Sequence, residues 1–347
     1  MTWDAAADAA QQVLAGRFWS RGHRLYRDLP GRRPILFWVR WNYWVQAHAL
    51  DVTVDAVGRT GSAAARERVR ANVAGILHRN GGRIVNRYYD DMSWMALALL
   101  RADEVAGVDT TGLVRDLWTD IAAAWDAQHG GIVWRRADPR PFTNAPANGP
   151  AAILAARLHR RLGDPAHLDQ AHRIADWLQH TLVDPDTGLV WDGIHPADDP
   201  GPDRTLYTYN QGTVIGAEVE LWRATGDRGH LERARRTAAA TLDRFAPEPG
   251  GLFPSEGVGD AGLFKGILAR YLGELVRFDP EPATGVSARV RAALTRNGDA
   301  LAPAAAAPVG VDWGRPGDGI PTLNSQVSAV LTLEALAALE RSEVGPV

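Results

Sequence analysis

Residues 86–100 read NRYYDDMSWMALALL, and the interpretation of the whole chain starts from this stretch. It begins with aromatic and charged residues and continues as an almost uninterrupted apolar segment. An apolar segment of this length, without a polar face, predicts a helix that is buried on all sides. Asp90 and Asp91 then stand in the first turn of a buried helix, where free backbone N–H groups favour carboxylates.

Helix capping explains a single aspartate at such a position. Two in succession, beside Tyr88, Tyr89 and Trp94, are harder to explain in that way. Like charges this close raise one pKa, and acid/base chemistry on a glycosidic bond requires that arrangement. From these residues alone, catalysis and capping with a solvated second carboxylate are equally good interpretations.

The composition is typical of a soluble globular protein, with 46% hydrophobic and 23% charged residues. A net charge of −3 gives no electrostatic reason to bind nucleic acid or an anionic membrane, so we expect neither partner. The absence of cysteine excludes disulfides, thiolate metal sites and cysteine nucleophiles. Because residues 1–30 lack a continuous apolar core, we expect no signal peptide and a cytoplasmic location.

The rest of the chain shows helical periodicity and no convincing strand alternation. Mostly apolar segments such as 151–158 and 327–339 alternate with amphipathic, Arg-rich segments such as 63–79 and 231–244. This alternation predicts buried helices enclosed by solvent-facing ones. The expected helices cover residues 3–27, 36–57, 61–79, 91–106, 110–128, 147–162, 165–182, 210–225, 228–245, 262–278, 284–300 and 322–340.

The connections between these helices also repeat. Short turns follow the buried helices, and residues 162–168 and 225–231 each predict a glycine C-cap followed by an aspartate N-cap. Long Gly/aromatic loops precede the buried helices at intervals of about 50–60 residues, which indicates repeated supersecondary units. Closing six helical hairpins into a ring avoids two exposed apolar ends. We therefore expect an all-α fold, an (α/α)6 barrel, formed by residues 1–347 as a single domain.

In such a ring, the start of every buried helix and the long loops lie at the same end. Five polar clusters fall there beside the Asp pair, with tryptophans in the loops above. Amide and hydroxyl groups over aromatic faces suit a neutral polyhydroxylated ligand, although capping explains any one cluster taken alone. The clusters are Trp41/Asn42/Gln46, Asn144/Asn148, Tyr209/Asn210/Gln211, Asp260/Lys265 and Asn324/Ser325/Gln326, and the tryptophans are Trp134, Trp191 and Trp313.

Other motifs are better explained as turns. Gly257–Gly262 matches the dinucleotide fingerprint, but no strand leads into it. Asp184–Gly188 resembles the start of a calcium loop, but the twelfth position is His195 where that loop requires Glu. Asp198–Asp199 lies in a Pro/Gly stretch without a following buried helix, and we expect it to be solvated. The histidines show no metal-ligand spacing, so we expect no metal and no cofactor.

Four parts of the sequence combine into a known pattern. They are Tyr88–Trp94, Gly130–Trp134 with Asn144–Pro150, Tyr209–Gly212, and Leu263–Ile267 with Arg270–Leu272. In this order they resemble glycoside hydrolase family 76, which contains the endo-acting α-1,6-mannanases, and the resemblance runs from about Trp38 to Gln326. It implies an (α/α)6 barrel and retaining hydrolysis, with Asp90 as the nucleophile and Asp91 as the acid/base.

The resemblance further implies a carbohydrate partner, α-mannan or a manno-oligosaccharide, and we expect the protein to be a monomer. Adjacent carboxylates at a helix start also favour retention. Direct attack suits carboxyl groups about 5–5.5 Å apart, whereas inversion needs about 6.5–9.5 Å. The residues expected to bind substrate are Tyr89, Trp94, Trp134, Asn144, Asn148, Trp191, Tyr209, Asn210, Gln211, Lys265 and Gln326.

Three alternatives stay open: a transglycosidase on mannosyl acceptors, a sugar 2-epimerase on the same barrel, and a binding protein with a degenerate site. Epimerases of this barrel type place catalytic histidines in the cavity, whereas the helix starts here carry Asp, Asn, Gln and Lys. The intact Asp pair argues against a binding protein. Many members of the family are secreted or anchored, and the polar N-terminal stretch is a departure from them.

Overall fold

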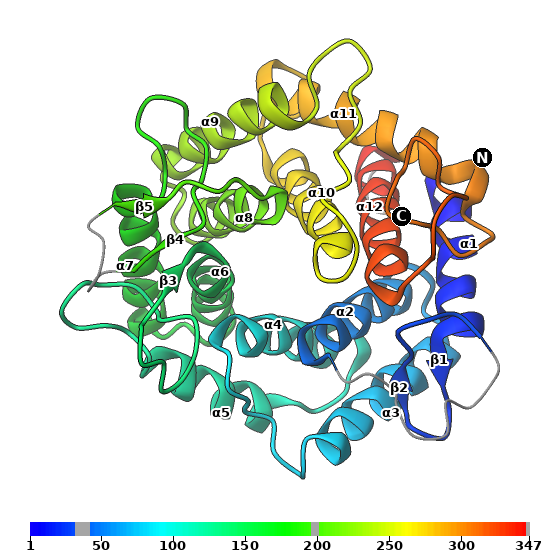
Figure 1. Cartoon of the computed structure of the whole chain (residues 1–347), viewed down its shortest axis with the longest axis horizontal. Coiled ribbons are helices and arrows are strands. Elements are labelled where there is room, and N and C mark those ends of the chain that lie inside the picture. The colour runs from blue at the N-terminus through cyan, green and yellow to red at the C-terminus, as the bar shows by residue number, and fades with distance from the viewer. Residues whose placement is uncertain (32–41, 196–200, 345–347) are drawn as a thin grey trace.

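The computed structural model of the protein describes residues 1–31, 42–195 and 201–344, and their twelve α-helices form two concentric rings (Figure 1). The inner ring consists of α2 (Tyr43–Thr60), α4 (Tyr89–Ala106), α6 (Ala145–Leu162), α8 (Thr208–Thr225), α10 (Ala261–Phe278) and α12 (Leu323–Val344). The outer ring consists of α1 (Trp3–Val13), α3 (Ala63–Arg79), α5 (Thr111–Ala122), α7 (Pro165–Thr181), α9 (Arg228–Phe245) and α11 (Gly285–Leu301). The expected (α/α)6 barrel is confirmed.

The inner helices are buried because neighbours surround them on every side. In α4, no residue from Met92 to Leu100 is more than 5% exposed. That helix contacts α2 and α6 within the inner ring and α5 in the outer ring. An outer helix such as α9 buries one apolar stripe and exposes its charged face. The predicted alternation of buried and solvent-facing helices is confirmed.

Glycines allow the inner helices to approach one another closely. A Cβ atom on Gly212 of α8 would lie 2.9 Å from the Cα of Leu268 in α10. A Cβ on Gly266 of α10 would lie 2.4 Å from the Cα of Ser328 in α12. Since real side chains do not pack at such distances, only glycine permits these crossings, and they draw one side of the inner ring together.

The two near-identical short turns have the predicted geometry. Gly163 and Gly226 end α6 and α8 in the left-handed conformation, with φ of 72° and 73°. Asp164 and Asp227 then cap the following outer helices by accepting backbone N–H bonds of 2.9 Å each. These tight turns hold one end of the barrel. The long loops lie at the opposite end, with the starts of the inner helices.

The helix expected over residues 3–27 is wrong in its second half. Beyond α1, a π-helical turn covers Leu14–Phe18, and two short strands follow, β1 (Trp19–Ser20) and β2 (Leu25–Tyr26). Arg24 between them has φ of 56°, a left-handed conformation that an α-helix does not accommodate. Of the expected helix 36–57, residues 36–41 lie outside the described part of the chain, as do Trp41 and Asp198–Asp199.

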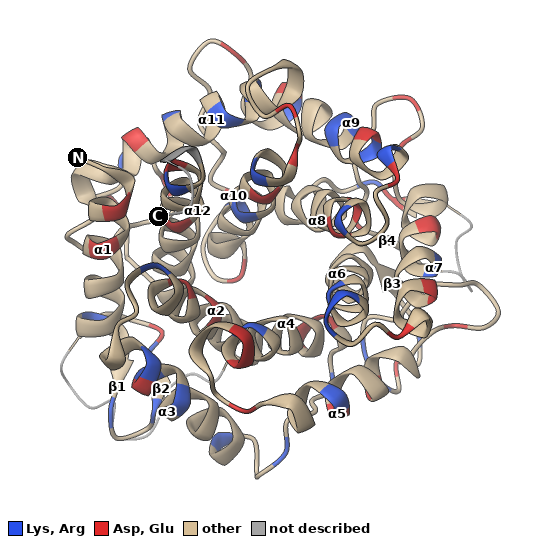
Figure 2. Cartoon of the chain, turned by 180° about the vertical axis from the view of Figure 1, so that it is seen from behind, with Lys and Arg blue, Asp and Glu red and all other residues tan. Residues whose placement is uncertain are grey.

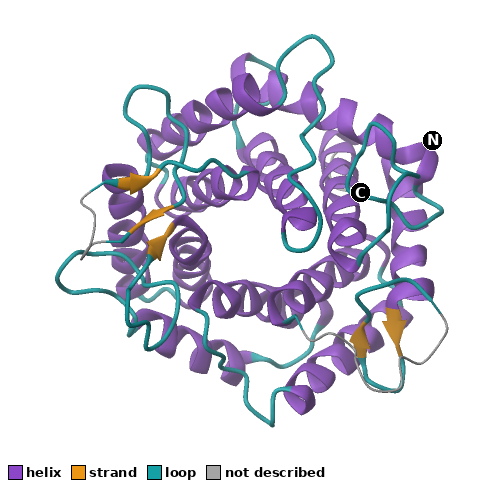
Figure 3. Cartoon of the chain, viewed as in Figure 1, coloured by secondary structure: helices purple, strands orange, loops and turns teal. Residues whose placement is uncertain are grey.

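The remaining strands lie in the long loops (Figure 3). Strands β3 (Thr143–Asn144), β4 (Gly193–Ile194) and β5 (Pro202–Asp203) form one small antiparallel sheet, and a 3-10 turn covers Ala302–Ala304. This sheet ties the loop before α6 to the loop before α8. Within the described ranges, no helix is long and apolar enough to cross a membrane.

The ring is closed by the first and last helices. Outer helix α1 packs against inner helix α12, as each other outer helix packs against an inner one. The backbone N–H groups of Trp3 and Asp4 donate to Glu340 Oε2 at 3.1 and 3.4 Å. Arg59 of α2 adds ion pairs to Asp8 at 2.8 Å and to Glu334 at 2.9 Å. Segments from both ends of the chain thus complete the barrel.

Candidate active site

The start of α4 is fixed by the loop that precedes α6. The backbone N–H of Tyr89 donates to the carbonyl oxygen of Trp134 at 2.9 Å, and Tyr88 pairs with Arg135 in an isolated β-bridge. The Tyr88 and Trp134 rings lie 5.2 Å apart between centroids. Tyr88 is the N-cap residue, but its side chain makes no capping bond. Backbone contacts with the neighbouring loop therefore hold this helix end, and the two aspartates are available for other contacts.

Asp90 accepts two hydrogen bonds from N–H donors. The indole Nε1–H of Trp134 donates to Oδ2 at 3.0 Å, and the backbone N–H of Asp91 donates to Oδ1 at 2.8 Å. Burial raises the pKa of Asp90 to about 6, while the two donors act in the lowering direction. Both donors favour the ionised carboxylate. At neutral pH, Asp90 is therefore the negatively charged member of the pair.

Asp91 has a different environment. Only one side-chain donor supports it, the Nδ2–H group of Asn86, which lies 2.7 Å from Oδ2. Burial, and after it the charge of Asp90, raise the pKa of Asp91 well above its usual range. Two neighbouring carboxyl groups with different donors and different pKa values are therefore present, one ionised and one protonated. Capping alone does not explain this difference, because only Asp90 accepts a free N–H group of the first turn, whereas Asp91 Oδ2 accepts from the side chain of Asn86.

A third carboxylate, Asp260, adds negative charge to the same end of the barrel. Its Oδ1 accepts from Asn42 Nδ2 at 3.0 Å and from Trp44 Nε1 at 3.1 Å. The charge of Asp260 contributes to raising the pKa of both Asp90 and Asp91. The negative field at this end therefore favours a protonated acid group beside the Asp90 carboxylate.

The expected aromatic residues divide by position. Tyr209 stacks on Phe264, with ring centroids 4.0 Å apart and an interplanar angle of 10°. Burial, and after it the charges of Asp192 and Asp90, raise the pKa of Tyr209 well above its usual range. Trp191 is partly exposed, with the guanidinium of Arg204 at 5.0 Å from its ring centroid.

Two other expected aromatic residues lie deeper. Tyr89 is buried, with Arg136 at 5.6 Å from its ring centroid. Trp94 is 4% exposed and packs against His48 in the barrel interior, with centroids 4.6 Å apart. Trp94 thus packs within the core, whereas Trp134 contacts Asp90 directly.

Several of the expected amide residues hold the long loops in place. Gln211 accepts from the Val190 N–H and donates to the Val190 carbonyl oxygen, both at 2.8 Å. Asn148 makes the same pair of bonds with Ile132, at 2.7 and 2.9 Å. Gln326 accepts from the Val309 N–H at 3.3 Å. These amides are at most 1% exposed. They support the loops that surround the Asp pair, and their expected contact with substrate stays a prediction.

The last three expected residues also have protein partners. Asn144 caps α6 through a 3.3 Å bond from Ala147 N–H. Asn210 Nδ2 donates to Asp192 Oδ1 at 2.9 Å, and its own Oδ1 is buried without a partner among the described residues. Lys265 Nζ donates to the carbonyl oxygen of Val311 at 2.6 Å, and burial lowers the pKa of this amine to about 8.

Two polar residues of the site, Asn86 and Asp192, were absent from the expected set, and Asp260 was expected only as a member of a polar cluster and not as a substrate-binding residue. Asn86 supports Asp91, and Asp260 adds the third carboxylate, as described above. Asp192 lies beside Asn210, and burial raises its pKa to about 6. Asn86 falls within the stretch that anchors the interpretation, and Asp192 directly follows an expected loop tryptophan. The sequence therefore carried a signal of position for both, but none that distinguished them from ordinary loop residues.

The donor chemistry of this end of the barrel consists of carboxylates, amides and aromatic rings. Within the residues that the structure describes, no three His, Asp or Glu side chains come together as a metal site would require. One ionised carboxylate beside one protonated carboxyl group is the arrangement used for acid/base and nucleophilic steps on a glycosidic bond.

Comparison with known families and proteins is consistent with this chemistry. Residues 2–345 match the family model for Glycosyl hydrolase family 76. The mannan endo-1,6-α-mannosidase DCW1 of Candida glabrata is 26% identical over 280 residues, which cover 73% of this chain and 61% of the yeast protein. The protein of the same name from Eremothecium gossypii is 26% identical over 253 residues, covering 66% and 54%. The chain thus spans less than two thirds of these curated relatives.

Solved structures match over nearly the whole chain. An inactive variant of the α-1,6-mannanase of Salegentibacter sp. HEL1_6, with two consecutive aspartates replaced by alanine, was solved in complex with α-1,6-mannotetrose. It has a TM-score of 0.89 and 32% identity, over 98% of this chain and 100% of that one. The Lin0763 protein of Listeria innocua has a TM-score of 0.88 and 30% identity, over 99% of each chain.

Proposed function

Because the chain belongs to glycoside hydrolase family 76, we propose that it hydrolyses α-1,6-mannosidic bonds in mannan or manno-oligosaccharides. The relatives and structural neighbours named for this activity support the linkage and the sugar. The observation that carries the proposal is the pair of neighbouring carboxyl groups at the start of α4, which differ in their hydrogen-bond donors. The proposed reaction needs this asymmetry, since one group attacks or stabilises while the other transfers a proton.

In the proposed mechanism, Asp90 is the nucleophile. Its two N–H donors stabilise the ionised carboxylate, which is the reactive form. Attack of Asp90 on the anomeric carbon breaks the bond to the leaving oxygen and forms a covalent mannosyl ester. The neighbouring positions of the two aspartates suit this retaining route, because an inverting route needs room for a water between the carboxyl groups.

Asp91 is the proposed acid/base. Its raised pKa keeps it protonated until the leaving oxygen takes the proton. Once the ester has formed, Asp90 carries no charge. The pKa of Asp91 then falls, because the repulsion between the two carboxylates has been removed. Asp91 then accepts a proton from water, which attacks the anomeric carbon and releases Asp90. Asn86 orients the Asp91 carboxyl in both steps.

Support for these roles also comes from the Salegentibacter structure, which was made inactive by replacing two consecutive aspartates. The chain contains two consecutive Asp pairs, at 90–91 and 198–199. The first pair begins a buried inner helix, where the Trp134 indole donates to Asp90. We therefore assign the chemistry to Asp90 and Asp91.

The test is digestion of linear α-1,6-mannan, with chromatography of product sizes and NMR of the first-formed reducing end. We expect short manno-oligosaccharides that appear first as the α anomer. Asp90→Asn is expected to fold and to lose on the order of 10⁴-fold in kcat. The matched control is Asp186→Asn, in an exposed turn, with unchanged turnover. A first-formed β anomer would remove the nucleophile assignment, products longer than the substrate would indicate a transglycosidase, and no turnover of the mannan would contradict the proposed substrate.

A further inference from the structure

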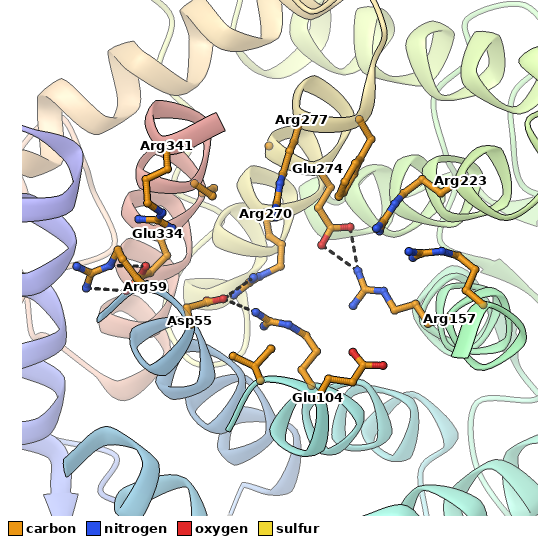
Figure 4. A pocket seen from close by; sticks show the side chains of 18 of the residues that line it. Asp55, Arg59, Glu104, Arg157, Arg223, Arg270, Glu274, Arg277, Glu334 and Arg341 are labelled. Atoms are coloured by element: carbon orange, nitrogen blue, oxygen red, sulfur yellow. Dashed lines mark hydrogen bonds and ion pairs between the residues drawn. The ribbon is translucent and has the colours of Figure 1, made fainter. Parts of the chain in front are cut away.

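The end of the barrel opposite the Asp pair contains a cavity of about 590 Å³ (Figure 4). We call it the basal cavity. Its walls come from the C-terminal halves of all six inner helices, and its charged residues include Asp55, Arg101, Arg157, Arg223, Arg270 and Glu274. A cavity of this size lies within the range of small-molecule sites, about 300–1,000 Å³. The proposed mannanase chemistry at the other end of the barrel does not use it.

One wall of the basal cavity is electrically balanced. Arg101 of α4 and Arg270 of α10 both bind the carboxylates of Asp51 and Asp55 on α2. Two guanidinium groups thus face two carboxylates in a closed network. Arg59 of α2 is likewise paired, with Glu334 of α12 and Asp8 of α1. This wall shows how the fold neutralises arginines near inner-helix ends.

The wall formed by α6, α8 and α10 has a surplus of positive charge. Besides Arg270, described above, and Arg161, which pairs with Asp103 and Glu104 of α4, it carries four arginines, Arg157, Arg160, Arg223 and Arg277, and two glutamates, Glu220 and Glu274. We call these six residues the arginine wall. Figure 2 shows Lys and Arg positions on these three inner helices from behind the barrel. The cavity therefore has two walls of similar helix geometry but different charge balance.

Glu220 is shared among three of these arginines. It accepts from Arg157 Nε at 2.8 Å, from Arg160 Nη1 at 3.0 Å and from Arg223 Nη1 at 2.8 Å. Its side chain is fully buried, so water does not assist it. The other carboxylate, Glu274, accepts two bonds from Arg157 Nη2, at 2.9 and 3.0 Å. Both glutamates of the arginine wall thus accept hydrogen bonds from Arg157.

The remaining arginines keep most of their donors. A guanidinium has five N–H groups. Arg160 and Arg223 each donate to one carboxylate oxygen, and Arg277 has no carboxylate partner among the described residues. Arg223 lies with its guanidinium carbon 3.6 Å from the Phe278 ring centroid. Burial lowers the pKa of Arg223, and the charges of Glu220 and Glu274 oppose this effect while those of Arg160 and Arg157 reinforce it.

A purely structural explanation is that these arginines neutralise the negative ends of the inner helices. The macrodipole supplies only about half a negative charge at each helix end. The last turn of α6 alone carries Arg160 and Arg161, and the last turns of α8 and α10 carry Arg223 and Arg277. The positive charge at these three helix ends is therefore larger than the helix dipoles require.

We propose that the arginine wall binds a small phosphate-bearing molecule in the basal cavity. The planar fork of each guanidinium matches phosphate oxygens in a bidentate manner, and phosphate at neutral pH carries the charge that the wall lacks. Arg160 and Arg223 supply the free N–H donors from two adjacent helices, and Arg277 adds positive charge from a third. The site is separate from the Asp pair and does not depend on the proposed mannanase activity.

The test is titration of the full chain with inorganic phosphate, followed by ³¹P NMR and by thermal unfolding, at an ionic strength matched with sodium chloride. The variant is Arg223→Gln, whose amide can still donate to Glu220. The control is Arg115→Gln, on the exposed face of α5, where the arginine side chain is 76% exposed. We expect saturable binding to the wild type and the control, with a rise in Tm, and at least tenfold weaker binding to Arg223→Gln.

A second measurement keeps the result interpretable. Without phosphate, Arg223→Gln should remain folded with a Tm close to that of the wild type, because its amide can still donate to Glu220 and because Arg157 and Arg160 still bind that carboxylate. If the arginine only supports the fold, the variant will be less stable and phosphate will stabilise neither protein. Equal binding by Arg223→Gln, or a Tm rise reproduced by sodium chloride alone, would overturn the proposal.

Discussion

Replacing Trp134 with phenylalanine should move the acidic limb of the pH–activity profile. The substitution keeps an aromatic ring but removes the indole N–H that donates to Asp90 Oδ2 at 3.0 Å. Asp90 must be ionised to act as nucleophile, and its pKa of about 6 means that activity is present above this pH and lost as the pH falls through it. Since the donor favours the ionised form, its loss raises the pKa of Asp90 further.

The size of this change follows from the hydrogen bond. A bond to a charged group contributes about 1.5–3 kcal/mol, and one pKa unit corresponds to about 1.36 kcal/mol. The pKa of Asp90 should therefore rise by about 1–2 units, to about 7–8. At pH 6, the ionised fraction falls from about one half to between about one tenth and one hundredth, so kcat/KM falls about 5- to 50-fold. At pH 9, the two proteins should differ much less.

The assay is kcat/KM on α-1,6-manno-oligosaccharides from pH 4 to 9. The control is Trp191→Phe, because the Trp191 indole lies under Arg204 and makes no bond to a carboxylate in the described structure. This variant should keep the wild-type acidic limb even if its KM rises. If Trp134→Phe lowers activity by the same factor at every pH, the indole does not tune Asp90, and the assignment of Asp90 as the ionised member of the pair loses its main support.

Three further predictions concern the acid group, the helix crossings and the loop supports. Asp91→Asn should lower kcat on mannan about 10²- to 10⁴-fold but spare an aryl mannoside whose leaving group needs no proton; equal losses on both substrates would argue against an acid role. Gly266→Ala should destabilise the fold by about 1–3 kcal/mol in urea unfolding, since its Cβ would meet Ser328, and an unchanged midpoint would show that the two helices can separate. Asn148→Ala should cost about 1–3 kcal/mol and speed hydrogen exchange at the Ile132 amide, whereas unchanged exchange would mean that other contacts hold this loop.

The fold was predictable because the sequence repeats one pattern, in which a buried apolar helix alternates with an amphipathic one. Apolar segments without a polar face had to become inner helices, and Gly163-Asp164 and Gly226-Asp227 specified their tight turns. The first 27 residues were mispredicted for an equally physical reason. Their composition suits a helix, but the backbone of Tyr26 is held by Gln46 of α2, in bonds of 3.0 and 2.8 Å. A contact between distant segments is invisible to local periodicity.

The location of the site was predictable from the sequence, but the role of each residue was less so. Position at an inner-helix start predicted Asp90, Asp91 and Tyr209 at one end of the barrel, and position in a long loop predicted Trp134 at the same end. It did not separate a side chain that faces the Asp pair from one that turns back to a loop. Gln211 lies at such a helix start, yet its side-chain amide oxygen accepts from the Val190 N–H and its amide N–H donates to the Val190 carbonyl oxygen. The direction in which an amide side chain points depends on which backbone N–H and C=O groups of a neighbouring loop lack partners. Those groups come close to the amide only in the folded chain.

The closure of the ring through α1 and α12 has a consequence for the order in which this protein folds. Trp3 and Glu340 are 337 residues apart in sequence but share a hydrogen bond. Joining chain segments so distant costs about 5 kcal/mol in loop-closure entropy if the chain between them is flexible. The helical hairpins between them therefore have to assemble first, as an open arc. The helices at the two ends of this arc still expose apolar side chains. Such an arc is prone to aggregate until its ends meet. We expect closure to be the slow step of refolding, and chaperones that shield the arc to raise its yield.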